Sequence, residues 1–330
     1  MRLKKILSHR RTELWPSWQL VYEWEDILSI QLDLPIAHVS KTYVILFKIF
    51  RRLGLSSLVQ WIDLKGKETS GQSLYFVMNA DKYFNYPLTK NTVPVIIDFY
   101  LSKQDLPEFY AAYKNCECVL ISSLEAFNFL KNNNCPLEIH HFPLSLPDKY
   151  KLYENSTFEK KINVLFAGRR NPILWDYVKK YAEENPDFEY VYQTNQNGIL
   201  LYESNKKGIL GEFNSREGYI NLLRSAKISF YATPGMDEIE NRTNGFNQVT
   251  PRFFELLSSG CLLIGRYPSN PDTEFYNLNE FCPGVHTYSE FKTLMESLST
   301  KSYSKNDYII YLNKHYTSMR AEQLKSMNTL

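Results

Sequence analysis

Two short stretches of the sequence combine residue types that bind phosphate groups and sugar hydroxyls. In the first, Gly168, Arg169 and Arg170 follow the apolar run "INVLF" and stand just before a helix start at Pro172. Glycine lets the backbone approach a ligand closely, guanidinium groups pair with phosphate oxygens, and the first N–H groups of a helix lack partners within it. This stretch therefore predicts a phosphate site, with an ordinary pair of surface arginines as the alternative.

The second stretch is "NQVTPRFFELLSSGCLLIG", residues 247–265. Thr250 and Pro251 predict a helix start, with threonine as the N-cap and proline in the first turn. Phe and Leu side chains share one face of this helix, whereas Arg252 and Glu255, three residues apart, are expected to point away from it. We expect this pair to face a ligand, and the alternative is a surface ion pair worth about 0–1 kcal/mol.

A third stretch is "YATPGMDEIE", in which Thr233 and Pro234 end a predicted strand in a tight turn. Such a turn lets a ligand approach the backbone, although a turn alone binds nothing. The acidic residues after it, Asp237, Glu238 and Glu240, are interpreted as a solvated loop.

The elements that must position these residues alternate between strands and helices. In the second half, strands are expected at 162–168, 188–194, 209–213, 227–235 and 261–265, and helices at 172–185, 215–226 and from Pro251 to a stop at Gly260, with Asn171 and Ser215 as caps. In the first half, strands are expected at 73–80, 93–100, 117–123 and 137–144, and helices at 105–116 and 124–134. Strands that alternate with helices predict parallel sheets with right-handed crossovers, so the expected fold class is α/β.

The polar segment 145–161 is the best candidate for a linker between two domains. We therefore expect two Rossmann-like domains, residues 1–150 and 151–330, whose parallel sheets face each other across a cleft. A closing helix over 307–324 is expected to run along the domains or to pack back on the first. Ligands of open parallel sheets bind beyond the carboxyl ends of the strands, which is where all three candidate stretches are expected to lie.

Composition limits the classes of protein to which the chain can belong. The chain has 330 residues, of which 44% are hydrophobic, so two sizeable cores are available. A net charge of +2, without long basic runs among aromatic residues, argues against a nucleic-acid binder. The five cysteines form no disulfide framework and lack the spacing of a metal site, so they are interpreted as reduced thiols of a cytoplasmic protein.

Positive charge gathers in two stretches of the first half, 1–12 and 41–67. The second mixes large apolar residues with Lys41, Lys48, Arg51 and Arg52, which is typical of an amphipathic helix on an anionic membrane. We expect both stretches to hold the chain at the inner face of a membrane. The alternative is an ordinary domain helix with a solvated basic face.

The order "GEFNSREGYINLLRSAKISFYATPG" followed by "NQVTPRFFELLSSGCLLIG" resembles the C-terminal half of GT-B glycosyltransferases. The resemblance is to the family 4-like, group 1 enzymes and the spore-maturation-type subgroup, over about residues 162–300 and more loosely over 90–145. It implies a retaining, hexosyl-type transferase that moves a sugar from a nucleotide-sugar donor to a glycan or lipid-linked acceptor in surface polysaccharide or glycoconjugate synthesis. It implies no cofactor and, since no Asp-x-Asp motif is present, no metal.

The resemblance also implies roles for residues of the donor site. Glu255 stands where the family's second acidic residue binds the ribose hydroxyls. Arg169 or Arg170, after Gly168, stands where a cation stabilises the departing diphosphate. A second cation would be Arg170 or Arg252.

One position departs from the family pattern. The family's first acidic residue lies eight positions before the second, where this sequence has Asn247, which bonds hydroxyls without carrying charge. The other residues expected to contact the donor are Thr233, Pro234, Gln248 and Thr250.

On the acceptor side, His140 and Asp98 are candidates for a base. An inverting enzyme needs such a group with a pKa near neutrality, whereas a retaining enzyme needs none. A purely structural role within the strands is the alternative for both residues.

Two other functions remain as alternatives. A GT-B-like scaffold without catalysis would bind a nucleotide, a glycan or a protein partner, and Asn247 in place of an acid favours it. A Rossmann-type oxidoreductase would need a Gly-x-Gly-x-x-Gly turn after a strand, and none is present.

Overall fold

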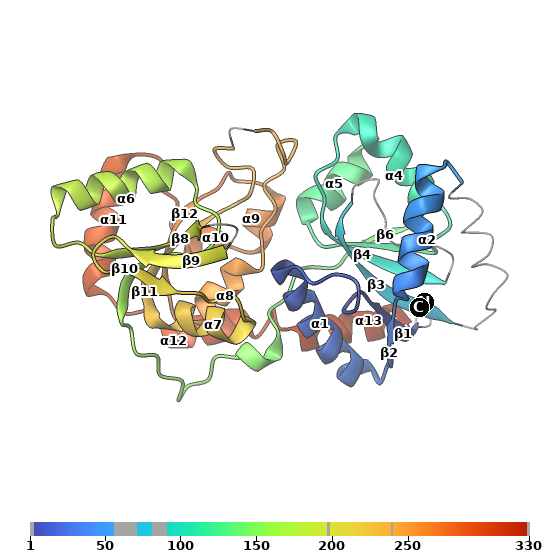
Figure 1. Cartoon of the computed structure of the whole chain (residues 1–330), viewed down its shortest axis with the longest axis horizontal. Helices are drawn as coiled ribbons and strands as arrows, with labels where there is room; N and C mark the ends of the chain where they lie inside the picture. The colour runs from blue at the N-terminus through green and yellow to red at the C-terminus, as the bar shows by residue number, and fades with distance from the viewer. Residues whose placement is uncertain (1–2, 56–70, 81–90, 197–198, 239, 329–330) are drawn as a thin grey trace. The chain divides into compact units, whose positions relative to one another are not determined.

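The computed structural model describes residues 3–55, 71–80, 91–196, 199–238 and 240–328, and the chain divides into two compact units (Figure 1). Unit 1 comprises Met1–Asp148, Thr243–Phe246 and Thr317–Leu330, and unit 2 comprises Lys149–Arg242 and Asn247–Tyr316. The chain thus enters unit 2 after Asp148, where the sequence analysis placed the boundary after residue 150. It returns to unit 1 twice, once as a four-residue segment and once as the C-terminal helix.

Unit 1 is built on a parallel sheet with the strand order β2-β1-β3-β4-β5-β6. The strands are β1 (Leu3–Ser8), β2 (Ile36–His38), β3 (Gln72–Asn79), β4 (Thr92–Asp98), β5 (Val119–Ile121) and β6 (Ile139–His141). The helices are α1 (Pro16–Leu32), α2 (Lys41–Arg52), α4 (Leu106–Tyr113), α5 (Leu124–Asn132) and α13 (Thr317–Asn328), with 3-10 turns η1 (Lys103–Asp105) and η2 (Asp148–Tyr150). The central strands β3 and β4 are nearly continuous apolar runs because helices cover both faces of a parallel sheet.

Unit 2 contains a second sheet, with the order β10-β9-β8-β7-β11-β12. The strands β7 (Ile162–Phe166), β8 (Tyr190–Gln196), β11 (Ala226–Ala232) and β12 (Leu262–Arg266) are parallel, and β9 (Ile199–Ser204) and β10 (Gly208–Gly211) form an antiparallel extension at one edge. The helices are α6 (Pro172–Glu184), α7 (Arg216–Ser225), α8 (Arg252–Ser258), α9 (Pro271–Phe275), α10 (Leu278–Phe281), α11 (Tyr288–Thr300) and α12 (Lys305–Leu312). In Figure 1, α6 and α11 lie on one face of this sheet, and α7, α8 and α12 lie on the other.

The predicted α/β class is confirmed, and several local signals act as expected. The Asn171 side chain accepts a hydrogen bond from the Leu174 N–H at 3.0 Å and so caps α6. Ser215 caps α7 in the same way, through the Gly218 N–H at 3.0 Å. Gly260, with φ 66°, follows the end of α8 in the left-handed conformation that glycine favours.

Two predictions about the chain ends are wrong. Most of the stretch 1–12 is not a basic surface arm, because Leu3–Ser8 is strand β1 between β2 and β3, with its apolar side chains buried. The expected helix over 307–324 is two helices, α12 and α13, which belong to different units. α12 ends at Leu312 and α13 begins at Thr317, so residues 313–316 interrupt the expected helix.

One strand was missed and one helix cap was predicted wrongly. Strand β9 was not expected, because its exposed apolar start, "ILL", does not alternate between apolar and polar residues. Thr250 does not cap α8: the N-cap residue is Pro251, without a side-chain hydrogen bond.

Among the described residues, no helix is both long enough and apolar enough to cross a bilayer.

His9, which directly follows β1, is almost fully buried, with 2% of its surface exposed. Its Nε2 lies 2.5 Å from the Tyr75 hydroxyl and its Nδ1 lies 2.7 Å from the Thr12 hydroxyl. Burial, and secondly the charge of Lys48, lowers the pKa of His9 from 6.5 to about 4. The imidazole is therefore a neutral part of the core at pH 7.

This pKa predicts a pH-dependent stability. Between pH 6.5 and about 4, the unfolded chain binds a proton at His9 that the folded chain does not bind, so stability falls as the pH falls through that window. The variant His9→Asn has no group at this position that titrates. As the pH falls from 6.5 to about 4, we therefore expect the wild type to lose up to about 3 kcal/mol of unfolding free energy relative to His9→Asn. Urea denaturation followed by tryptophan fluorescence measures it, and a difference that does not vary with pH would contradict the prediction.

Candidate functional site

The candidate site lies at the carboxyl ends of β7, β11 and β12 in unit 2. β8 and β11 lie on opposite sides of β7, so the chain leaves β7 in one direction and later returns to its other side. Such a switch point is where open α/β sheets bind ligands. The pairs Leu165–Ser229 and Ala232–Arg266 set the register, and they bring the segments 167–171 and 233–237 to the same edge as Arg266.

Gly168 and Arg252 are in contact at this edge. Gly168 has a φ of 72°, and a Cβ atom there would lie 2.3 Å from Nη2 of Arg252. Both the backbone conformation and the space occupied by the guanidinium therefore require glycine. Burial acts to lower the pKa of Arg252, but Tyr219, which hydrogen-bonds the guanidinium, together with Tyr202 and Glu255 outweighs burial and raises it.

Glu255 forms an ion pair with Arg216, which was not predicted to belong to the site. Its Oε1 lies 2.7 Å from Nη2 of Arg216, at the first turn of α7, and 4% of Glu255 is exposed. The other carboxylate oxygen, Oε2, makes no hydrogen bond with a described residue. Glu255 does not point into open solvent, because α7, α12 and the sheet pack against this helix and residues 253–258 are buried.

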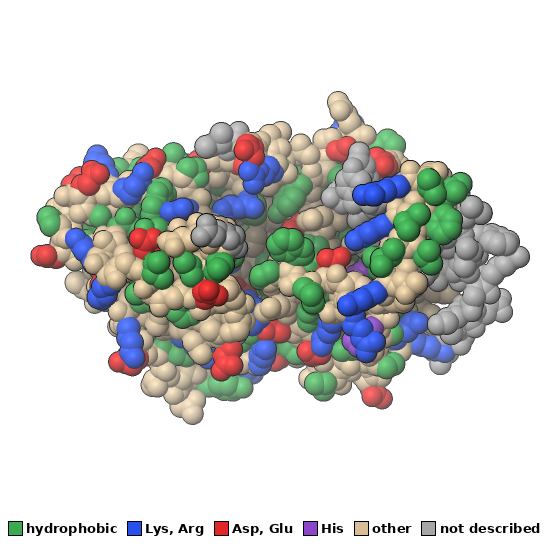
Figure 2. Space-filling view, in the orientation of Figure 1, with side chains coloured by type: hydrophobic (Ala, Val, Ile, Leu, Met, Phe, Trp, Pro, Cys, Tyr) green, Lys and Arg blue, Asp and Glu red, His purple; other side chains and the backbone are tan. Residues whose placement is uncertain are grey.

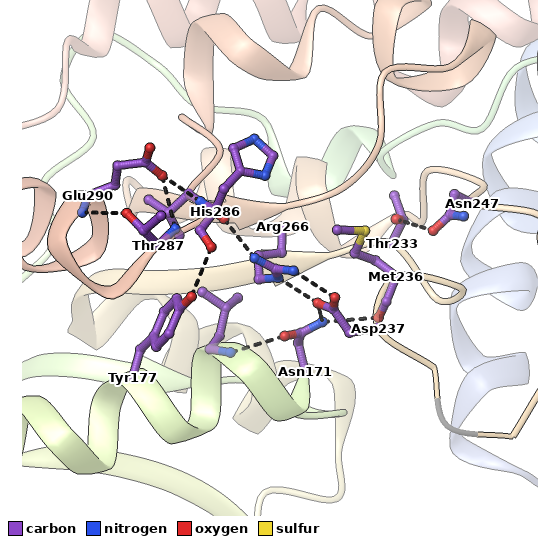
Figure 3. A network of polar contacts seen from close by, with 12 residues as sticks. Asn171, Tyr177, Thr233, Met236, Asp237, Asn247, Arg266, His286, Thr287 and Glu290 are labelled. Atoms are coloured by element: carbon purple, nitrogen blue, oxygen red, sulfur yellow. Dashed lines mark hydrogen bonds and ion pairs between the residues drawn. The ribbon is translucent and has the colours of Figure 1, made fainter.

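Three predicted donor-site residues are held together at the end of β11. The Thr233 hydroxyl donates to Oδ1 of Asn247 at 2.7 Å (Figure 3). The Thr250 N–H donates to the Tyr231 hydroxyl at 2.9 Å. Asn270 donates from its side chain to the Asn247 carbonyl at 3.1 Å. The other two predicted contact residues are Gln248, which is buried, and Pro234, which is half-buried.

A polar network fixes the loop after β11, and it is drawn in Figure 3. Arg266 donates from Nε and Nη2 to the two Asp237 oxygens at 2.5 and 2.6 Å. Asn171 donates to Asp237 at 2.8 Å and to the Met236 carbonyl at 3.0 Å. The interpretation of Asp237 as solvated is therefore wrong: burial acts to raise its pKa, but the hydrogen bonds from Arg266 and Asn171 lower it.

The two arginines after Gly168 have different surroundings. The Arg170 guanidinium lies over the Trp175 ring, 4.3 Å from its centroid, and 5.5 Å from that of Tyr192. Arg169 is exposed and forms no ion pair with the described residues. Of the two candidates for a second cation, Arg252 lies against Gly168, whereas Arg170 stacks on aromatic rings.

The structure does not bring the two predicted acceptor-side residues together in unit 1. Asp98 ends β4 and His140 lies on β6, with β5 between them. His140 faces Glu138 at 3.3 Å, with 42% of its side chain exposed. Its neighbour His141 has a pKa lowered to about 4, chiefly by burial.

Four features of this site were not predicted from the sequence: Arg216, Tyr202, Tyr219 and the Asp237–Arg266 pair. A signal existed for Arg216, because a cation in the first turn of a helix opposes the helix dipole and needs a compensating partner. No signal existed for Tyr202, which reaches Gly168 from the unexpected strand β9. Within the described part of the chain, no group of three His, Cys, Asp or Glu side chains is placed to hold a metal ion.

No family model matches the chain, and no curated protein matches it. Several solved structures are similar, and three of them are described here. The pneumococcal O-GlcNAc transferase GtfA, in complex with UDP and GlcNAc, matches with a TM-score of 0.45 and 11% identity, over 77% of this chain and 56% of that one. The sucrose-phosphate synthase from Thermosynechococcus elongatus matches with a TM-score of 0.42 and 10% identity, over 83% and 71%.

The third similar structure is the glycotransferase of kitacinnamycin, with a TM-score of 0.45 and 11% identity, over 99% of both chains. This chain therefore spans little more than half the length of the O-GlcNAc transferase.

The contact between Gly168 and Arg252 predicts a difference between two glycine substitutions. Gly208 has a φ of 74° and open space around its Cβ position, so Gly208→Ala is a matched control for Gly168→Ala. Both should lose about 1–2 kcal/mol of stability through the left-handed backbone. Only Gly168→Ala should also displace Arg252 and weaken the binding of inorganic pyrophosphate at least about tenfold, as expected for one lost charged hydrogen bond. Calorimetry measures this, and equal binding by the two variants would contradict it.

Proposed function

We propose that this chain is a glycosyltransferase that moves a sugar from a nucleotide-sugar donor to a glycan or lipid-linked acceptor. The observation that carries the proposal is the contact of Arg252 with Gly168 at the switch point of unit 2. There, a permanently charged guanidinium lies beside a glycine backbone at the place where parallel sheets bind ligands.

The distribution of charge supports a site for a diphosphate. Arg216 and Arg266 are paired with Glu255 and Asp237, so carboxylates balance their charges. Arg252 has no carboxylate within ion-pair distance among the described residues. Its positive charge is therefore available to a phosphate of the donor, and Arg169 supplies a second cation from the exposed side of the same loop.

The proposed chemistry follows from this charge. The bond from the anomeric carbon to the diphosphate oxygen breaks, and the electron pair leaves with the nucleoside diphosphate. A new bond forms from the anomeric carbon to the acceptor hydroxyl oxygen, whose proton ends on the departing phosphate or on water. Arg252 and Arg169 stabilise the negative charge that develops on the leaving group.

Glu255 is proposed to bind the ribose of the donor. Arg216 holds Oε1 and fixes the orientation of the carboxylate, while Oε2 remains for a ribose hydroxyl. Asn247 would bond a hydroxyl of the sugar, in place of the carboxylate that related enzymes have. The Thr233 hydroxyl donates to the Asn247 side-chain oxygen and so holds this amide at the end of β11.

We further propose that the donor carries a hexose, that the transfer retains the configuration of the anomeric carbon, and that the product belongs to a surface polysaccharide or glycoconjugate. A retaining mechanism needs no protein base on the acceptor, and it leaves structural roles for Asp98 and His140. The location proposed for this activity is the cytoplasmic face of a membrane, where lipid-linked acceptors lie.

A second candidate function is a scaffold that binds a nucleotide without catalysis. Asn247 in place of an acid favours it, and so does the burial of Glu255 in its ion pair with Arg216. Such a scaffold would bind nucleoside diphosphates but would neither hydrolyse nor transfer a sugar.

Turnover of donors tests the proposal. We expect slow hydrolysis of one sugar nucleotide among UDP-, GDP-, CDP- and ADP-sugars, and we expect Arg252→Met to reduce kcat by about 100- to 1000-fold, as for other lost electrostatic stabilisers. Arg242→Met is the control, because Arg242 is an exposed arginine of the same unit that pairs with Glu240. Chromatography of released nucleotide measures it. Binding without turnover would favour the scaffold, and neither binding nor turnover would reject both.

Metal independence is a separate prediction. If guanidinium groups alone neutralise the diphosphate, EDTA should leave the rate of donor turnover unchanged within about twofold, and added Mg²⁺ or Mn²⁺ should not restore Arg252→Met. The same chromatographic assay measures both effects. A rate that falls with EDTA and recovers with a divalent cation would show that a metal shares the task.

A further inference from the structure

We propose that helix α2 docks unit 1 on a membrane surface that carries anionic headgroups. The inference goes beyond the transferase function and does not depend on it, because it concerns one helix of unit 1 that shares no residue with the donor site. It follows from three faces of α2 that differ in chemistry.

The first face is apolar and exposed. At about 100° per residue, Ile45, Leu46, Ile49 and Leu53 fall within one arc of about 100° along α2 and its last turn. Their exposed fractions are 58%, 46%, 48% and 65%. Scattered exposed leucines are normal on protein surfaces, but four large aliphatic side chains in one arc mark an interaction surface.

The second face is cationic and borders the first. Lys41, Lys48 and Arg52 are all exposed, and they fall within about 40° of each other next to Ile45. Figure 2 shows Lys and Arg side chains in a row along α2, with hydrophobic side chains beside them. The third face holds Val44, which is buried in unit 1.

This order of faces fits a lipid surface. A helix that lies on a bilayer buries its apolar arc at the boundary of headgroups and acyl chains, and its flanking Lys and Arg side chains reach the phosphates while their stems cover apolar surface. The charge of the second face selects anionic headgroups. Residues 1–12 do not share this role, because most of them form the interior strand β1 and its turn.

A second copy of the chain fits the same surface less well. Two copies joined through this face by a twofold axis would bring two sets of three cations together. A helix of three turns also offers much less than the roughly 800 Å² per partner of a stable interface. The observations therefore favour a lipid occupant.

Vesicle binding by the full chain tests the inference. We expect co-sedimentation with vesicles of equimolar phosphatidylcholine and phosphatidylglycerol, and much weaker co-sedimentation with phosphatidylcholine alone. Each Lys or Arg near an anionic surface strengthens binding about fivefold, so Lys41→Gln, Lys48→Gln and Arg52→Gln together should weaken it about a hundredfold. Ile45→Glu with Ile49→Glu should weaken it at least about tenfold, because the apolar arc no longer inserts.

Ile310→Glu is the matched control, because Ile310 is an equally exposed isoleucine, at 54%, on α12 of unit 2. It should bind vesicles like the wild type. All substituted residues are exposed, so thermal unfolding should be unchanged, and the charge variants test the inference even if the glutamate variant folds poorly. Equal binding by wild type and variants, or no binding by the wild type, would overturn the inference. A wild type that ignores vesicles but dimerises in light scattering, and loses this with Ile49→Glu, would assign the surface to a second copy.

Discussion

The guanidinium of Arg252 fits at the end of β7 only because residue 168 has no side chain and adopts a left-handed φ of 72°. Much of the site depends on this contact. It joins the first loop of unit 2 to the start of α8, and Tyr219 and Tyr202 enclose it from α7 and β9. These neighbours also explain why a partly desolvated guanidinium remains charged, since a buried cation is tolerated where hydrogen bonds and nearby oxygens compensate for lost water. The cation is therefore in place before any ligand arrives, which is what electrostatic catalysis requires.

Ion pairs determine which other charges remain available. Arg266 is bound by Asp237, and the same carboxylate, through Asn171, ties the loop after β11 to the N-terminus of α6. Removing one partner of so enclosed a pair is costly, because the other charge would remain largely out of water. Arg216 is likewise committed to Glu255. The carboxylates thus serve as parts of the frame, and Arg252, which forms no ion pair with the described residues, lies at the switch point of the sheet.

The sequence predicts the parts of the molecule whose signals are local. Pro172 after Asn171, Ser215 before α7 and the apolar runs of β3, β4 and β11 identify elements within a few residues, and their alternation identifies the α/β class. What it could not predict depends on contacts distant in the chain. The pairing of Glu255 with Arg216 spans 39 residues, and Tyr202 reaches Gly168 from a strand whose residues do not alternate. A basic N-terminus was misread as a surface arm because its apolar residues, alone, are too few to indicate an interior strand.

The most direct test of the account is calorimetric titration of the wild type and Arg252→Met with UDP, GDP, CDP and ADP and with the matching monophosphates, without added metal. The account predicts that one diphosphate binds the wild type at least about tenfold more tightly than its monophosphate, because the second phosphate meets Arg252. It further predicts that Arg252→Met removes this preference while leaving the monophosphate affinity nearly unchanged. A wild type that binds mono- and diphosphate equally, or a preference that survives in Arg252→Met, would contradict the assignment of this edge of unit 2 as a diphosphate site.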